Sequence, residues 1–372
     1  MQAIGTVLAL QGELEAALRW HEQALQREEA AGDVEGQGVT MHEIGTVLAR
    51  QGELEAALRW YEQALQRKEA AGDVRGQGVT MHAIGTVLAR QGKLEAALRW
   101  YEQSLQLDEA AGDVRGQGVT MHAIGTVLAR QGKLEAALRW YEQSLQLDEA
   151  AGDVRGQGVT MHAIGTVLAK QGELEAALHW YEQALPRKEA AGDVRGQGVT
   201  MHAIGTVLAK QGELEAALRW YEQALPRKEA AGDVRGQGVT MHEIGNVLAK
   251  QGKLEAALRW YEQSLQLDEA AGDVRGQGVT MHEIGNVLAR QGKLEAALRW
   301  YEQSLQLDEA AGDVRGQGVT MHAIGTVLAR QGKLEAALWK RCCLPKMFQV
   351  TNGWVQRVVA WVLHIWRGWF RR

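Results

Sequence analysis

The feature that most constrains this chain is a 40-residue unit that recurs head to tail over residues 1–338. Residues 81–120 and 121–160 are identical. A unit this short cannot bury its own apolar face, but stacked copies cover one another. The sequence therefore predicts a stack of repeats, with copies beginning at residues 1, 41, 81, 121, 161, 201, 241 and 281 and a truncated copy at 321.

Each unit contains two apolar stripes with the spacing i, i+3, i+4, i+7, which is typical of one face of an α-helix. The two stripes predict two helices, here named helix A and helix B in the order in which they form a hairpin. The stripe of helix A comprises Met81, Ile84, Gly85 and Leu88, and that of helix B comprises Leu94, Ala97, Leu98, Tyr101 and Leu105.

Glycine and aspartate mark the predicted helix ends. Gly92 and Gly112 follow the two stripes, and glycine adopts the left-handed conformation that ends many helices. Asp113 comes next, and its carboxylate can accept the free N–H groups of a helix start. We predict helix A over Val114–Arg130 and helix B over Leu94–Ala111, joined by short turns.

The unit also resembles a known repeat family. Met81-x2-Ile84-Gly85-x2-Leu88 followed by Ala97-x3-Tyr101 is similar to the tetratricopeptide pattern of large-x2-Leu-Gly-x2-aromatic and Ala-x3-aromatic. Two features depart from it. Glu109 stands where a proline is usual, and the period exceeds the usual ~34 residues, with the extra length in Glu109–Gln117.

Long repeats that end in Gly-Asp resemble the subgroup found in kinesin light chains, nephrocystin-like proteins and Leu-Gly-Asn-rich adaptors. The resemblance implies an all-α fold, an α-solenoid of antiparallel hairpins in a right-handed superhelix. It also implies a non-catalytic scaffold that binds a partner segment in its concave groove.

Net charge and composition limit the classes of partner and the cellular location that we expect. The chain carries a net charge of −5, but residues 339–372 hold seven basic and no acidic residues, so the repeats carry −12. An acidic array argues against general nucleic-acid binding. No signal peptide precedes the repeats, and Cys342 and Cys343 are the only cysteines, so we expect a cytoplasmic protein without a disulfide framework.

The copies differ in two ways that bear on structure. Some end helix B with Arg-Lys, as at Lys68, and others with Leu-Asp, as at Asp108; duplication of blocks explains this as well as charge compensation does. Pro186 and Pro226 fall inside helix B, where proline removes a hydrogen bond. We expect a kink or an early helix end in those two copies.

The repeat stops at Trp339, and residues 339–372 form a basic tail with five of the 13 tryptophans. The stretch Trp354–Arg372 fits an amphipathic helix, too short and too charged to span a membrane comfortably. Three interpretations stay open: a helix in a membrane interface, a cap on the solenoid, or a shifted reading frame without selected function.

One histidine per repeat suggests a metal array at first sight. Neighbouring repeats are ~10 Å apart, however, whereas zinc needs ligands ~2 Å from one centre. No nucleophile and base recur together, and Gly116-Gln117-Gly118 follows no strand, so it does not fit a phosphate loop. We expect no metal, no cofactor and no catalysis.

The histidine instead belongs to a ladder spaced i, i+4, i+8 on helix A. In tetratricopeptide arrays this face looks into the groove. Asn246 and Asn286 give Ile-Gly-Asn, which is similar to the Leu-Gly-Asn of the adaptor families, where such an asparagine holds a peptide backbone. The predicted groove residues are His42, Thr46, Arg50, His82, Thr86, Arg90, His122, Thr126, Arg130, His162, Thr166, Lys170, His202, Thr206, Lys210, Asn246, Lys250, Asn286 and Arg290.

These rows predict a groove for an extended, acidic segment of a protein or peptide partner. The competing interpretation is a plain solvated face. The tryptophan before each core tyrosine, as at Trp100, is expected to pack between repeats rather than to form a second, exposed binding row. A membrane-associated adaptor held by the tail and a truncated repeat-gene product without a partner are the two rival functions.

Overall fold

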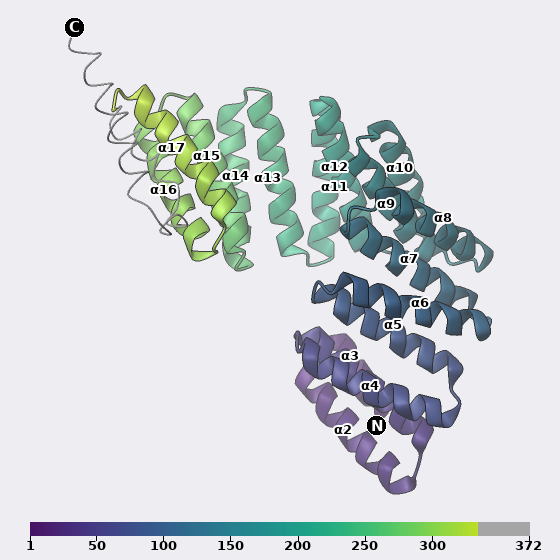
Figure 1. Cartoon of the computed structure of the whole chain (residues 1–372). Coiled ribbons are helices and arrows are strands. Elements are labelled where there is room, and N and C mark those ends of the chain that lie inside the picture. Colours follow the sequence, from purple (N-terminus) through teal and green to yellow (C-terminus); the bar gives the residue numbers. More distant parts are fainter. Residues whose placement is uncertain (334–372) are drawn as a thin grey trace, which may run out of the picture. The chain divides into compact units, whose positions relative to one another are not determined.

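A computed structural model describes residues 1–333, and in this range the chain is built of helices alone (Figure 1). The helices form successive hairpins, with odd-numbered helices as helix A and even-numbered ones as helix B, and within each of the two units described below the hairpins lie side by side in chain order. The helices are α1 (Gln2–Gln11), α2 (Leu14–Ala31), α3 (Val34–Gln51), α4 (Leu54–Ala71), α5 (Val74–Arg90), α6 (Leu94–Ala110), α7 (Val114–Arg130), α8 (Leu134–Ala150), α9 (Val154–Gln171), α10 (Leu174–Ala190), α11 (Val194–Gln211), α12 (Leu214–Ala230), α13 (Val234–Lys250), α14 (Leu254–Ala270), α15 (Val274–Arg290), α16 (Leu294–Ala310) and α17 (Val314–Arg330).

The predicted helix ends are confirmed, apart from one residue at the end of α6. Gly92 and Gly112 have φ values of +81° and +65°, the left-handed conformation. The Asp113 carboxylate accepts the backbone N–H of Gly116 at 2.9 Å and so caps α7. The same glycine–aspartate pair precedes each later helix A, and the local sequence therefore sets the hairpin boundaries.

Each hairpin is held by close packing of helix A on helix B. A Cβ placed on Gly85 would lie 2.8 Å from the Tyr101 ring, so the two helices approach at a point that only glycine permits. Ile84, Ala97 and Tyr101 are buried around this contact. The glycine of the family-like motif therefore serves close helix packing.

The chain divides into two compact units, one from Met1 to Ala231 and one beginning at Gly232. Within each unit, every helix A that stands between two hairpins contacts both of them. Consecutive A helices also contact one another, as α5 and α7 do, whereas consecutive B helices in the described residues do not. The A helices therefore form the more closely spaced, inner layer of each unit. The all-α solenoid fold is confirmed.

The prolines do not shorten their helices. Pro186 lies inside α10, which has 17 residues like α6 and ends at the equivalent alanine, and Pro226 in α12 repeats this arrangement. The predicted early end is wrong, because the proline ring is exposed while Tyr181 and Lys188 on either side are buried. A kink at these prolines stays a prediction.

Two further expectations concern the tryptophans and the tail. Trp100 and its equivalents are partly buried, which agrees with packing between helices rather than with an exposed row. Within residues 1–333 no helix combines the length and the apolar character needed to cross a membrane. The interpretations of residues 339–372 lie outside the described residues.

Candidate partner-binding face

The predicted groove residues lie on one face of the A helices, in the inner layer of each unit. In α5, Thr86 and Arg90 are exposed and His82 is partly buried. The equivalent residues of α3, α7, α9, α11, α13 and α15 follow the same order, with the threonine or asparagine ranging from partly buried to exposed. The structure thus brings the three predicted rows together on one layer, and their role in binding stays a prediction.

The histidines connect neighbouring repeats. His82 Nδ1 lies 3.2 Å from the Thr120 hydroxyl of the next helix A, and its ring centroid is 5.1 Å from that of Tyr101. Burial lowers the pKa of His82 to about 4, so the imidazole is neutral at pH 7. Sequence reasoning missed this bond because the two residues are 38 positions apart.

The middle row is also tied into the hairpin. Thr86 donates to the His82 carbonyl at 3.0 Å and accepts from the Tyr101 hydroxyl at 3.1 Å. Where asparagine replaces threonine, the Tyr261 hydroxyl donates to Asn246 Oδ1 at 2.7 Å. The side-chain oxygen of this row therefore already has an intramolecular donor.

The arginines of the basic row bind a backbone carbonyl at the end of the preceding helix A. Arg90 Nη1 donates to the Ala49 carbonyl at 2.7 Å, and Arg130 repeats the bond to Ala89 at 2.8 Å. A carbonyl in the last turn of a helix lacks an intrahelical partner and attracts positive charge. Both guanidinium side chains remain exposed, as does Lys170.

A row of valines extends this face toward the start of helix A, and sequence reasoning missed it. Val79 is 47 % exposed, and Arg75 one turn earlier has a side chain that is 72 % exposed. Positions 75, 79, 83, 86 and 90 share one face of the helix, a spacing that could have shown the row. The exposed valines of this row are Val39, Val79, Val119, Val159, Val199, Val239, Val279 and Val319.

The charge of this face differs between copies. Position 83 is alanine in α5, and the equivalents in α7, α9 and α11 are also alanine. In α3, α13 and α15 the same position is Glu43, Glu243 and Glu283, each partly buried. The faces of α5 to α11 therefore carry the two basic rows without this carboxylate.

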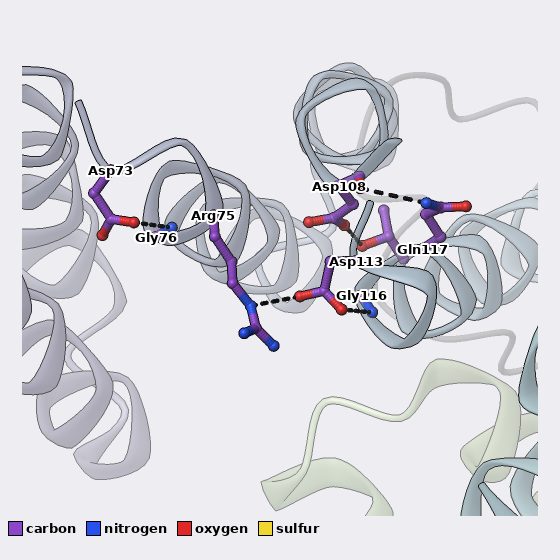
Figure 2. A network of polar contacts seen from close by, with 8 residues as sticks. Asp73, Arg75, Gly76, Asp108, Asp113, Gly116 and Gln117 are labelled. Atoms are coloured by element: carbon purple, nitrogen blue, oxygen red, sulfur yellow. Dashed lines mark hydrogen bonds and ion pairs between the residues drawn. The ribbon is translucent and has the colours of Figure 1, made fainter. Parts of the chain in front are cut away.

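The start of helix A meets the preceding repeat through a polar network (Figure 2). Arg75 Nε lies 2.7 Å from Asp113 Oδ2, and the other Asp113 oxygen caps Gly116. The N–H of Gly116, and then Arg75, hold the pKa of Asp113 below its usual range. The pair links two neighbouring A helices across their exposed edge.

A cavity of about 240 Å³ opens between the starts of α5 and α7. Asp108, from helix B, is only 3 % exposed, and its Oδ2 accepts the Thr120 hydroxyl at 3.1 Å. Burial raises the pKa of Asp108, and the Thr120 hydrogen bond opposes the shift. The cavity lining comprises Arg75, Val79, His82, Ser104, Asp108, Asp113, Arg115, Gly116, Val119 and Thr120.

Comparison with known proteins identifies the repeat. The family model described as "Tetratricopeptide repeat" matches almost the whole repetitive region, over residues 1–70, 37–110, 76–150, 117–190, 156–230, 196–270, 236–310 and 276–338. The chain belongs to the tetratricopeptide repeat family. No protein with a curated description matches it.

Solved structures share the tetratricopeptide fold at low sequence identity. The apo form of the quorum sensor NprR from B. thuringiensis is 15 % identical, with a TM-score of 0.64; the match covers 90 % of this chain and 97 % of that one. The apo form of RapI is 14 % identical, with a TM-score of 0.59 and coverage of 74 % and 99 %. BtubC (BKLC) from P. vanneervenii is 17 % identical, with a TM-score of 0.53 and coverage of 59 % and 92 %.

Family membership supports a protein-interaction scaffold, the general role of tetratricopeptide repeats, which are in general non-catalytic. The finer subgroup predicted from the Gly-Asp ending stays a prediction. Over residues 1–333 no three His, Cys, Asp or Glu side chains gather as a metal site would require. A cytoplasmic location and the lack of nucleic-acid binding stay predictions.

Proposed function

We propose that the inner face of α5, α7, α9 and α11 binds an extended, acidic segment of a partner protein. The observation that carries the proposal is the row pattern of this tetratricopeptide face. Each of the four helices presents an exposed arginine, an exposed valine and an exposed arginine or lysine, with alanine in place of the glutamate found in α3, α13 and α15.

Charge supports an acidic rather than a basic partner. The histidines of this face are neutral at pH 7, because burial lowers the pKa of His82 and His122 to about 4 and that of His162 to about 3. Arg90 and Lys170 therefore supply its net positive charge. Arg75 and Arg115 add exposed guanidinium groups whose charge is partly balanced by the aspartates with which they pair. Complementary charge favours the encounter with acidic segments and opposes basic ones.

The valine row supports a segment with apolar residues between its acids. Val79 and Val119 are each nearly half exposed and stand one helix apart on the same layer. Neighbouring helices pack ~8–10 Å apart, a distance spanned by about three residues of extended chain. A segment in which apolar and acidic residues alternate over this distance would fit both rows.

The test adds negative charge where other copies already carry it. Ala83→Glu, Ala123→Glu and Ala203→Glu copy the residues of α3, α13 and α15, and the fold should tolerate them. Fluorescence anisotropy with a Glu-rich peptide of about twelve residues should show a loss of affinity of about tenfold or more. A peptide with Lys in place of Glu serves as the opposite-charge probe.

The matched control places the same charge on helix B. Gln103, Gln143 and Gln223 are exposed there, and changing them to Glu adds three negative charges away from the valine row. This variant should keep near-native affinity for the Glu-rich peptide. Equal losses in both variants, or tighter binding of the Lys-rich peptide, would contradict the proposed face.

A further inference from the structure

From α4 onward, the contact between helix B and the next helix A occurs in two forms that bury opposite charges; the first copy has Glu28 at this position. Lys68 is 5 % exposed, whereas Asp108 at the equivalent position of the next copy is 3 % exposed. We name these the Lys junction and the Asp junction. Asp junctions contain Asp108 and Asp148 in the first unit and Asp268 and Asp308 in the second.

The Lys junction shows how this frame holds an ammonium group. Lys68 Nζ donates to the Gly76 carbonyl at 3.2 Å and to the Thr80 hydroxyl at 3.0 Å. Burial lowers the pKa of Lys68, and the nearby Asp73 carboxylate opposes the shift. The start of helix A thus offers a carbonyl, a hydroxyl and a carboxylate around one buried cation.

The Asp junction keeps this frame but lacks the ammonium. Gly116, Thr120 and Asp113 stand at the positions of Gly76, Thr80 and Asp73. Asp108 is shorter than lysine: its Oδ1 lies at the place where Lys68 has its Cγ, as judged from the facing glycines Gly78 and Gly38. The 240 Å³ cavity opens beside this shorter side chain.

The charges around the cavity do not compensate the buried acid. The Asp113 carboxylate raises the pKa of Asp108 more than the nearby Arg75 lowers it. Arg75 pairs with Asp113, and Arg115 pairs with Asp153 at 3.1 Å. Asp108 takes part in no ion pair within the described part of the chain, and the His82 ring is neutral at pH 7. A buried carboxylate without a cation is unfavourable, and a bound ammonium would relieve this.

We propose that each Asp junction is a pocket for the side chain of a lysine in the partner segment. The ammonium group would contact the Asp108 carboxylate at the cavity floor, with the Ser104 and Thr120 hydroxyls beside it. Val79 and Val119 line the cavity and would cover the lysine methylenes. The partner's ammonium would then occupy the same frame of polar groups that holds the chain's own lysine ammonium in the Lys junction.

The cavity rim indicates which residues should flank the lysine in the partner segment. Arg75 and Arg115 line the rim and are largely exposed, so residues flanking the lysine should be acidic or apolar. This part rests on the proposed function. Two Asp junctions follow one another in each unit, so two lysines ~10 Å apart would engage both.

The test compares two peptides on the full chain. The first is a Glu-rich peptide with one central lysine, and the second carries norleucine there, which keeps the methylenes and removes the ammonium. Anisotropy titrations at pH 7.5 should give about 10- to 100-fold tighter binding of the lysine peptide, the range for a charged hydrogen bond in a buried site. Equal affinity of the two peptides would overturn the pocket while leaving the acidic-segment function in place.

Converting the Asp junctions into Lys junctions tests whether they cause the preference for the lysine peptide. Changing Ser104→Ala with Asp108→Lys, and likewise at 144/148, 264/268 and 304/308, copies the Ala64–Lys68 pair of the chain itself. Asp→Asn at the four aspartates is the second variant, and circular dichroism checks that both fold. Both should bind the two peptides alike, whereas a surviving lysine preference would overturn the pocket. Binding of neither peptide to the native chain would overturn both proposals.

Discussion

At the scale of single residues, the glycine of the helix A motif marks the closest approach of the two helices. Gly85 faces the Tyr101 ring, where an added Cβ would lie 2.8 Å away, and Gly125 faces the Tyr141 ring at the same distance. Gly85 lies inside a helix, where alanine is the better helix former. Packing and helix propensity therefore act in opposite directions at this position.

Gly85→Ala should therefore destabilise the chain by about 1–3 kcal/mol through overpacking. Gln103→Ala at an exposed position of α6 is the control and should change the free energy of unfolding by less than about 0.5 kcal/mol. Urea unfolding followed by circular dichroism, with midpoints compared at one pH, checks both. A Gly85→Ala variant as stable as the Gln103→Ala variant would contradict the assigned contact.

The histidines give stability a predictable dependence on pH. Burial lowers the pKa of His82 and His122 to about 4 and that of His162 to about 3, from an unfolded value near 6.5. Between these values the unfolded chain binds more protons, so stability from these residues is lost as the pH falls from 6.5 toward 4. The urea concentration at the unfolding midpoint should therefore be lower at pH 5.0 than at pH 7.5.

The buried aspartates act in the opposite sense. Burial raises the pKa of Asp148 from 3.8 to about 6, so its ionisation disfavours the fold as the pH rises through that range. Changing His82, His122 and His162 to Gln should therefore flatten or invert the dependence. An unchanged slope would mean that these imidazoles are not buried in solution.

At the scale of helices, most of the architecture was predictable from the sequence. Val114–Arg130 is the predicted helix, because Asp113 caps its start and the glycine at 132 ends the turn that follows. The histidine ladder lies along helix A for the same reason, since helical spacing fixes a face, and its part in a groove stays a prediction. The His82–Thr120 bond was not predictable, because it depends on how one hairpin seats on the next.

The helices that contain proline were not predicted correctly. Helix propensity predicts an early end at Pro186, but α10 continues to Ala190. Pro186→Gln and Pro226→Gln, which copy Gln106, should each stabilise the chain by up to about 3 kcal/mol. Urea unfolding checks this, with Gln106→Pro as the reciprocal change that should destabilise α6; equal stability of all three would show that the stack absorbs the proline.

At the scale of the whole molecule, stability should follow the number of neighbouring contacts. Deleting residues 121–160 joins copies whose junction sequences are already present, since 81–120 is identical to the deleted segment. The shortened chain should keep its helicity per residue and unfold at a slightly lower urea concentration, because repeat stability is a sum of units and interfaces. Unfolding of the whole shortened chain at native conditions would contradict this nearest-neighbour account.

The buried ion of each junction has a consequence for how such genes change length. Lys68 and its partners Asp73, Gly76 and Thr80 lie within one short run of sequence, and Asp108 has the same frame in Asp113, Gly116 and Thr120. When a block is gained, lost or moved and its ends fall outside this run, each buried charge stays together with the groups that solvate it. Unequal recombination can therefore lengthen or reorder the array without stranding an ion in its interior.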